Sequence, residues 1–458
     1  MQYSAFFGTS AADLFRPGLL PVPPTGEFSK MLRRFPSASR VALRGFGSAM
    51  TLAIALASGA AVVTAATAVP AAAQRGGRAP EPQNSEAFVK AYEPVAAIVS
   101  AETGDFAAAK PQIPGLVATI QTPDDRNAAG NLILALGNKL RDAQLQRQGL
   151  ELMVASGKTD PAQLGQFQYF IGSLAYDAKD WAAARTALEA AVAAGFTEED
   201  PGPMIAETYF GEGQAAQGLT YLKTLVEKRT AAGQAVPETW LTRGLQVAYQ
   251  AQLGAQATEW SALLVAHSPN QTNWQRALQV VNTMNQLDTQ ARLDLLRLML
   301  ATNALSDRRE YEAYIEAADP RIMANEVDRV LAAGVQAGVF PSGDQYYTDI
   351  KQIVDQRAPA DRRDAPSLAD EARSAANGNA AQNAGDVFMS LGSWAEAEEM
   401  YALALEKGVN DRDRALTRLG IAQAQQGKKA EARATFGQVG GARVPVARMW
   451  TAYVESRA

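Results

Sequence analysis

The chain has 458 residues and no cysteine, which excludes disulfide bonds, thiolate zinc sites, cysteine nucleophiles and a lipid-modified N-terminal cysteine. It has one histidine, His267, in the run LLVAHSPNQ, and the simplest interpretation places it at a helix end, where the helix dipole favours it. A metal site or a catalytic triad needs partners that the sequence does not supply. We therefore expect no metal and no cofactor.

Aromatic residues are scarce, at 7% of the chain, and no segment alternates between apolar and polar residues as a half-buried strand would. Hydrophobic residues make up 47%, with alanine prominent among them, and they recur with a helical period. A chain of this length forms two or three ordinary domains or one long solenoid that never closes on itself. The periodicity favours the solenoid, and the predicted fold class is all-α.

Clustered positive charge is also missing after residue 73. The whole chain carries a net charge of −5, and without residues 1–73, which carry a net of +4, it carries −9. A nucleic-acid-binding protein would present a clustered basic face. The sequence therefore argues against a nucleic-acid partner, and it contains no polybasic helix for an anionic membrane.

The segment from Ala384 to Val439 contains two copies of one helical-hairpin sequence pattern. The first copy reads AGDVFMSLGSWAEAEEMYALALEKGV and the second reads LGIAQAQQGKKAEARATFGQV, with equivalent residues 35 positions apart. This period is typical of chains that stack helix pairs. The equivalent pairs are Gly385 and Gly420, Gly392 and Gly427, Ala397 and Ala432, and Tyr401 and Phe436.

A third copy, IGSLAYDAKDWAAARTALEAAVAAGF, ends at Phe196. Its Gly172, Trp181 and Ala184 take the places of Gly385, Trp394 and Ala397. This order of small, glycine, aromatic and alanine positions resembles the tetratricopeptide repeat. The resemblance implies a right-handed α-α superhelix with a concave face lined by the first helix of each pair.

Alignment with that repeat family also implies which side chains face the groove and contact a partner. The alternative interpretation is that the same residues are ordinary surface. Basic and asparagine residues of the kind that hold a peptide's terminal carboxylate in some family members are not recognisable, so capture of a peptide C-terminus is not expected. The expected groove residues are Tyr169, Ser173, Tyr176, Glu207, Phe210, Asp386 and Met389.

The N-terminal part of the chain has the pattern of a secretory signal. From Met31 the sequence reads MLRRFPSASRVALRGF, then an apolar run, then the small residues of Ala71–Ala73. This order predicts export and cleavage after Ala73. The alternative is an uncleaved membrane anchor, because the apolar run is long enough to span a bilayer. We expect a periplasmic protein without membrane insertion after cleavage.

Composition divides the remaining chain into segments. The stretch 74–84, QRGGRAPEPQN, is a Gly- and Pro-rich tether. Residues 1–30 are expected to be a non-native extension, because Met31 is the better start. Degenerate repeats are expected over 85–356. A polar, proline-punctuated joint is expected over 357–380, and the C-terminal repeat pair with a capping helix over 381–458.

These expectations favour a non-catalytic scaffold that mediates protein–protein interaction in the cell envelope, with an envelope protein or peptide as its partner. The alternative from a different class is an α-helical hydrolase or glycan-processing enzyme that uses carboxylates in the groove. It requires two carboxylates about 5 to 10 Å apart across a pocket. No spacing in the sequence selects such a pair.

Overall fold

A computed structural model of the chain describes residues 83–457, and this part is all helical, with no strand within it. The all-α fold class is thereby confirmed for the described residues. The predicted extension 1–30, the signal 31–73 and residues 74–82 of the tether lie outside them.

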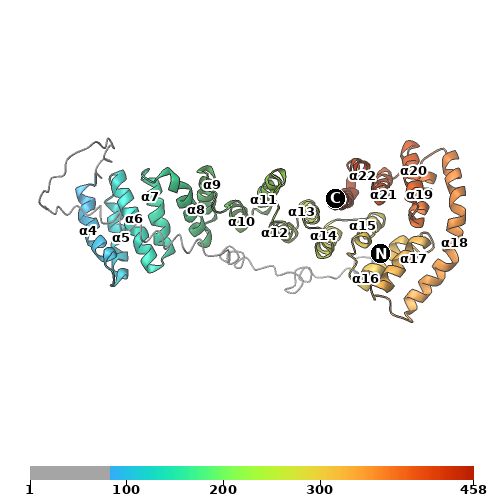
Figure 1. Cartoon of the computed structure of the whole chain (residues 1–458), viewed down its shortest axis with the longest axis horizontal. Coiled ribbons are helices and arrows are strands. Elements are labelled where there is room, and N and C mark those ends of the chain that lie inside the picture. The colour runs from blue at the N-terminus through green and yellow to red at the C-terminus, as the bar shows by residue number, and fades with distance from the viewer. Residues whose placement is uncertain (1–82, 458) are drawn as a thin grey trace, which may run out of the picture. The chain divides into compact units, whose positions relative to one another are not determined.

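The described residues belong to two compact units, which divide between Gln214 and Ala215 (Figure 1). The division falls inside the segment 85–356 that we expected to be one array, because α10 packs on α9 whereas α11 packs on α12. The helices of unit 1 are α4 (Glu86–Ser100), η1 (Phe106–Gln112), α5 (Ile113–Ala118), α6 (Pro123–Leu140), α7 (Ala143–Ala155), α8 (Pro161–Asp177), α9 (Trp181–Ala193) and α10 (Gly202–Gly211).

Unit 2 continues the pattern of consecutive antiparallel contacts and adds a longer helix, α18. Its helices are α11 (Ala215–Ala231), α12 (Glu238–Gln250), α13 (Gly254–His267), α14 (Gln271–Met284), α15 (Thr289–Ala301), α16 (Arg308–Ala318), α17 (Ala324–Gln336), α18 (Gln345–Ser374), α19 (Asn379–Leu391), α20 (Trp394–Glu406), α21 (Arg412–Gln425), α22 (Lys429–Phe436), η2 (Gly441–Arg443) and α23 (Val444–Ser456).

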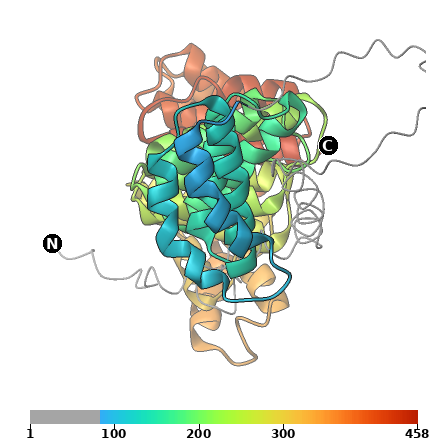
Figure 2. The same cartoon turned by 90° about the vertical axis from the view of Figure 1, so that its left-hand side faces the viewer.

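The helix starts in unit 1 follow local capping chemistry. The Thr122 side chain accepts a hydrogen bond from the Asp125 backbone N–H at 3.0 Å, and the Asp125 carboxylate accepts one from the Thr122 N–H at 3.1 Å. With Pro123 at the first helical position, this capping box fixes the start of α6. In Figure 2, α4 lies beside α6 and α6 beside α7, as their contacts require.

Four hairpins share one packing device, a glycine in the first helix beneath a large side chain 16 positions later in the second. A Cβ atom added at Gly385 would lie 2.8 Å from the Tyr401 ring, and one at Gly420 would lie 2.5 Å from the Phe436 ring. Only glycine allows the two helices to approach so closely. The four pairs are Gly172 and Leu188, Gly244 and Trp260, Gly385 and Tyr401, and Gly420 and Phe436.

The turns and alanines of these hairpins also recur. Gly392 and Gly427, predicted as equivalent, both adopt left-handed backbone with φ of 78° and 75°, and Lys179 takes the corresponding conformation with φ of 60°. Each of the four hairpins has a fully buried alanine in its second helix, five positions after the residue with left-handed backbone in the turn. These alanines are Ala184, Ala257, Ala397 and Ala432.

The segment 357–380, expected to be an irregular joint, differs from that expectation. Most of it continues α18 as one helix to Ser374, with Pro359 and Pro366 inside. Buried alanines such as Ala358, Ala365 and Ala369 form a stripe at helical spacing, and α18 packs against α17 and α19. This tertiary packing outweighs the cost of the prolines, which the polar composition alone did not reveal.

The last helix does more than cover an open end. One hydrophobic core runs from Val265 of α13 to Val454 of α23, and α23 packs directly on α13, α14 and α15. The Tyr453 ring meets the edge of Trp274 at 6.2 Å and that of Trp450 at 5.4 Å. Unit 2 is therefore closed by contacts between distant parts of its sequence, unlike a solenoid whose repeats touch only their neighbours.

Candidate functional site

A buried ion-pair network lies where α15 meets the C-terminal helices of unit 2. The Asp294 side chain has no exposed surface and pairs with three arginines. Its carboxylate accepts from Arg297 at 2.5 Å, Arg418 at 3.2 Å and Arg443 at 2.7 Å. The Trp450 indole donates to the Asp294 carbonyl oxygen at 2.9 Å. One residue of α15 therefore holds α21, η2 and α23 together.

Arg418 extends the network to a second carboxylate, Asp386 of α19. The Arg418 Nη1 lies 2.5 Å from Asp386, and the Tyr401 hydroxyl donates to the same oxygen at 2.6 Å. Arg414 pairs with the other Asp386 oxygen. The Arg418 side chain is fully buried, so its charge depends on Asp294 and Asp386 for compensation.

Glu326 of α17 is the third buried carboxylate. Arg297 binds it with both ends of its guanidinium, from Nε and Nη2, each at 2.8 Å. The Tyr314 hydroxyl donates to the same carboxylate at 2.8 Å. A planar guanidinium is suited to this two-bond geometry, which fixes the angle between α15 and α17.

These contacts keep the buried carboxyl groups ionised. Burial by itself raises the pKa of Asp294, but Arg418, Arg297 and Arg443 outweigh it and lower the pKa from 3.8 to about 2. Burial likewise opposes ionisation of Asp386 and Glu326, and their arginine partners again lower the pKa of each. None of the three holds a proton to donate near neutral pH.

We expect unit 2 to lose stability in acid through these groups. Each pKa is lower in the folded protein than in the unfolded chain, so the stabilisation is complete above the ordinary pKa values and is lost as pH falls from about 4.5 to about 2. For Asp294 alone, the change from 3.8 to about 2 corresponds to about 2 kcal/mol. Urea unfolding at several pH values checks this, and Asp294→Asn should flatten the dependence; an identical dependence in both proteins would contradict the assignment.

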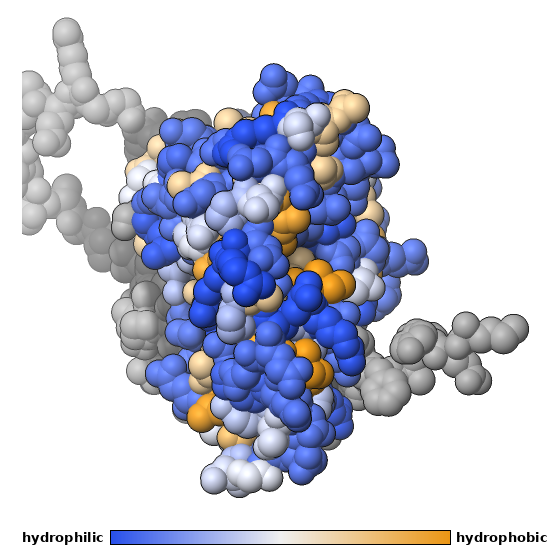
Figure 3. Space-filling view, turned by 90° about the vertical axis from the view of Figure 1, so that its right-hand side faces the viewer, coloured by the Kyte–Doolittle hydropathy of each residue, from blue (hydrophilic) through white to orange (hydrophobic). Residues whose placement is uncertain are grey.

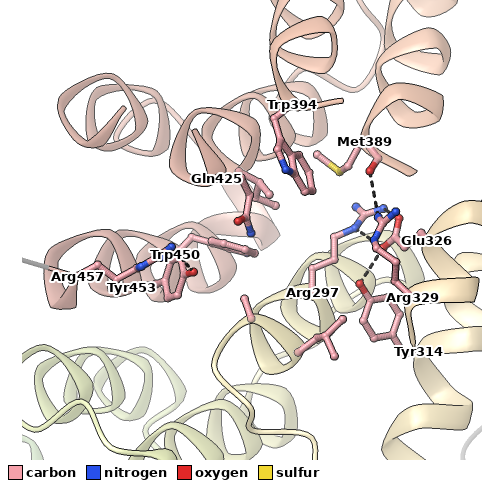
Figure 4. A pocket seen from close by; sticks show the side chains of 13 residues that line it. Arg297, Tyr314, Glu326, Arg329, Met389, Trp394, Gln425, Trp450, Tyr453 and Arg457 are labelled. Carbon is pink, nitrogen blue, oxygen red and sulfur yellow. Dashed lines mark hydrogen bonds and ion pairs between the residues drawn. The ribbon is translucent and has the colours of Figure 1, made fainter. Parts of the chain in front are cut away.

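Beside the network lies a pocket of about 290 Å³ (Figure 4). Its wall combines aromatic rings with arginines, and the Trp394 and Gln425 side chains lie between the α23 residues on one side and the Arg297–Glu326 pair on the other. The lining residues are Arg297, Leu300, Ala301, Tyr314, Glu326, Arg329, Met389, Trp394, Ile421, Gln425, Trp450, Tyr453 and Arg457.

Two arginines at the pocket are bound by neutral oxygen atoms. Arg329 donates to the carbonyl oxygens of Asn325 at 3.2 Å and Ser390 at 2.7 Å. Arg457 donates to the Tyr453 hydroxyl at 2.7 Å and lies over the Tyr453 ring. Within residues 83–457, neither arginine has a carboxylate within ion-pair distance. Both are exposed, so the pocket reaches solvent beside them.

The seven residues predicted to line a groove are divided between the two units, with five in unit 1 and two in unit 2. Ser173, Tyr176 and Phe210 are partly exposed in unit 1, and Glu207 there is buried. Tyr169 is also buried. It stacks on Phe196 at 4.8 Å and donates to Glu199.

The two predicted groove residues of unit 2 lie in its interior. Asp386 belongs to the ion-pair network. Met389 is 1% exposed, and it is one of the residues that line the pocket. Neither is available on a surface groove. The reason is that α19 is covered by α17, α18 and α20, which the repeat alignment did not anticipate.

Apart from Asp386, which was predicted to face the groove, the charged residues of the network were missed by the sequence analysis, although a signal was present. Asp294 and Arg297 interrupt the run ARLDLLRLMLA, where charged residues stand among leucines. Arg418 stands similarly in ALTRLGIA. A charge inside an apolar helical run needs a buried partner. The sequence does not show which distant residue supplies it.

No group of three metal-ligating side chains occurs among the residues that the structure describes. Glu326 is the one carboxylate among the pocket-lining residues in residues 83–457, and Arg297 and Tyr314 bind it. The pair of facing carboxylates that the glycan-processing alternative requires is not formed at this pocket.

A second hollow, of about 550 Å³, runs along α18 and is lined by residues from Tyr347 to Gln356. The face of unit 2 that carries α18 is mostly hydrophilic, with small separate apolar patches (Figure 3). This hollow has no convergent charge or aromatic wall comparable with that of the first pocket.

Across residues 83–457, no helix combines the length and apolarity needed to cross a membrane. Comparison of the chain with models of known protein families gives no match, and comparison with curated proteins gives none either.

Proposed function

We propose that this protein is an exported helical-repeat scaffold of the tetratricopeptide type, which binds a partner protein or peptide in the cell envelope and is not an enzyme. The observation that carries the proposal is the recurrence of one hairpin design. A glycine beneath a large side chain 16 positions later occurs in α8/α9, α12/α13, α19/α20 and α21/α22. Stacked hairpins of this kind create extended binding surfaces.

The partner surface is best placed in unit 1. There Ser173 and Tyr176 of α8, the first helix of the α8/α9 hairpin, and Phe210 of α10 remain partly exposed. In unit 2 the predicted groove residues of α19, Asp386 and Met389, are buried and are not available to a partner protein. The proposed contact surface is therefore α8 and α10.

Position-specific photo-crosslinking tests this surface. A photoreactive residue at Ser173 should yield a discrete adduct in the envelope, whereas one at Thr186, exposed on the second helix α9, should not. Adducts of equal yield from the two positions would contradict the proposed surface. Absence of any adduct from Ser173 and from neighbouring α8 positions would contradict the scaffold function.

Export supplies a separate prediction. The arginine-rich segment from Met31, the apolar run and the Ala71–Ala73 site support cleavage after Ala73, so the mature chain should begin at Gln74. Intact-mass measurement of the envelope-resident protein checks this. A chain that still begins at Met1 or Met31 would instead support the membrane-anchor alternative.

A further inference from the structure

We propose that the pocket of unit 2 binds a small organic anion that carries one aromatic ring. This small-molecule site goes beyond the scaffold function and is independent of the partner surface in unit 1. The proposal stands on three properties of the pocket: its charge, its hydrogen-bonding groups and its size.

The charge of the pocket wall is positive. Arg297 is neutralised by Glu326 and Asp294, with which it forms ion pairs. Arg329 and Arg457 are bound by neutral oxygens and form no ion pair with a described residue, and only Arg329 lies near a carboxylate, that of Glu326, whose pKa it lowers. They enter the wall from opposite sides (Figure 4). A ligand with a carboxylate would supply the missing negative charge.

The hydrogen-bonding groups also favour an acceptor. The Glu326 carboxylate, the strongest acceptor in the wall, already receives bonds from Arg297 and Tyr314. Among the described residues, the side chains of Trp394 and Gln425 have no hydrogen-bond partner. The Trp394 indole only donates, and the arginines only donate. Unused donors thus outnumber unused acceptors, and a carboxylate satisfies them better than an amine or a hydroxyl.

Size and shape limit the ligand further. The volume of about 290 Å³ lies just below the range of about 300 to 1,000 Å³ typical of ligand pockets. It accommodates a single ring with a short acidic chain and is too small for an oligosaccharide. The Trp394 ring is partly exposed and offers a flat apolar surface against which an aromatic ring packs, and the edge of the Tyr453 side chain, which is 7% exposed, lies at the same wall.

A bound ligand would contact helices from the middle and from the C-terminal end of unit 2. The pocket residues come from α15, α16, α17, α19, α20, α21 and α23. Because the ligand binds only the folded, closed arrangement, it should raise the melting temperature of unit 2 in a concentration-dependent manner.

The test compares 3-phenylpropionate with its neutral analogue 3-phenylpropionamide by isothermal titration calorimetry on the mature protein. The acid should bind with a Kd on the order of 0.1 mM, as its small number of atoms permits. The amide should bind at least about tenfold more weakly, because one unpaired charge is worth roughly that factor. The affinity of the acid should also fall as salt is raised.

Variants locate the site. Arg457→Gln removes a pocket charge from an exposed side chain, and Arg329→Gln removes the other; at least one should weaken binding of the acid about tenfold. Arg373→Gln removes an exposed arginine of the same unit that lies outside the pocket wall, and it should leave the affinity unchanged.

Melting curves establish that each variant is folded. No binding of the acid, equal affinities for acid and amide, or an affinity unaffected by both pocket variants would each overturn the proposal. None of these results would alter the outcome of the crosslinking test in unit 1. The scaffold function and the small-molecule site can therefore be contradicted independently of each other.

Discussion

Asp294→Asn should reduce the free energy of unfolding of unit 2 by about 3–5 kcal/mol, the cost typical of breaking a buried ion pair by removing one partner. The substitution keeps the shape of the side chain and removes its charge. Arg297 retains Glu326, and Arg418 retains Asp386, but Arg443 keeps only Asp288 at 3.8 Å. A buried arginine without a close carboxylate is the main source of the loss.

A matched control in the same unit is Asp328→Asn. Asp328 pairs with Lys351 at 3.0 Å, but both side chains are about one-third exposed. Such a pair contributes about 0–1 kcal/mol. Urea unfolding followed by tryptophan fluorescence measures both variants, because five of the six tryptophans belong to unit 2. An equal loss of unfolding free energy in the two variants would mean that the buried ion-pair network does not stabilise unit 2 more than an exposed ion pair does.

Ala397→Trp should be the second most damaging change, with a loss of about 3 kcal/mol or more, at or above the upper end usual for overpacking. Ala397 is fully buried in α20, four positions before Tyr401, where α20 crosses α19. The two helices leave no room for a larger side chain at this crossing, because the Gly385 backbone of α19 already contacts the Tyr401 ring of α20. An indole at this position has to push the two helices apart.

Ala402→Trp provides the comparison on the same helix. Ala402 is exposed, so the added ring extends into solvent and the expected change is within about 0.5 kcal/mol. Denaturation curves of the two variants separate a specific packing effect from a general cost of adding tryptophan to α20. A small loss at Ala397, comparable with that at Ala402, would show that the helix crossing is placed wrongly.

Local repeat chemistry was predictable from the sequence. The glycines at 172, 385 and 420 lie where the helices of a hairpin approach, as expected from their spacing. These features depend on residues within one hairpin, and such residues leave a periodic pattern. The Gly244 and Trp260 pair has the same spacing but was not recognised. In α12/α13 the residue with left-handed backbone in the turn, Gln252, comes one position later after the packing glycine than in the other hairpins, so the pattern is out of register.

Closure of unit 2 was not predictable in the same way. The Asp294 and Arg443 side chains meet across 149 positions, and the Asp294 and Trp450 contact spans 156. No periodicity connects such residues, since each contact depends on how all the intervening helices turn. Charged residues inside LDLLRLML indicate that buried partners exist, but not which residues they are.

Composition was misleading at α18 for a related reason. Pro359 and Pro366 and a polar sequence favoured an irregular joint. The helix persists because its alanine stripe is buried against neighbouring helices, and such packing stabilises helices more than local propensity does. The candidate pocket depends on the same long-range arrangement, so its residues could not be grouped from the sequence.

Hydrogen exchange in α23 tests the central claim, that unit 2 is closed by its last helix, most directly. Backbone amides of the segment Val444–Ser456 should exchange as slowly as those of α13, on which α23 packs, because both open only when the unit unfolds. A helix that merely capped an open array would fray and exchange its amides long before α13 does. Rapid exchange throughout α23 beside a protected α13 would contradict the closed arrangement, and with it the pocket.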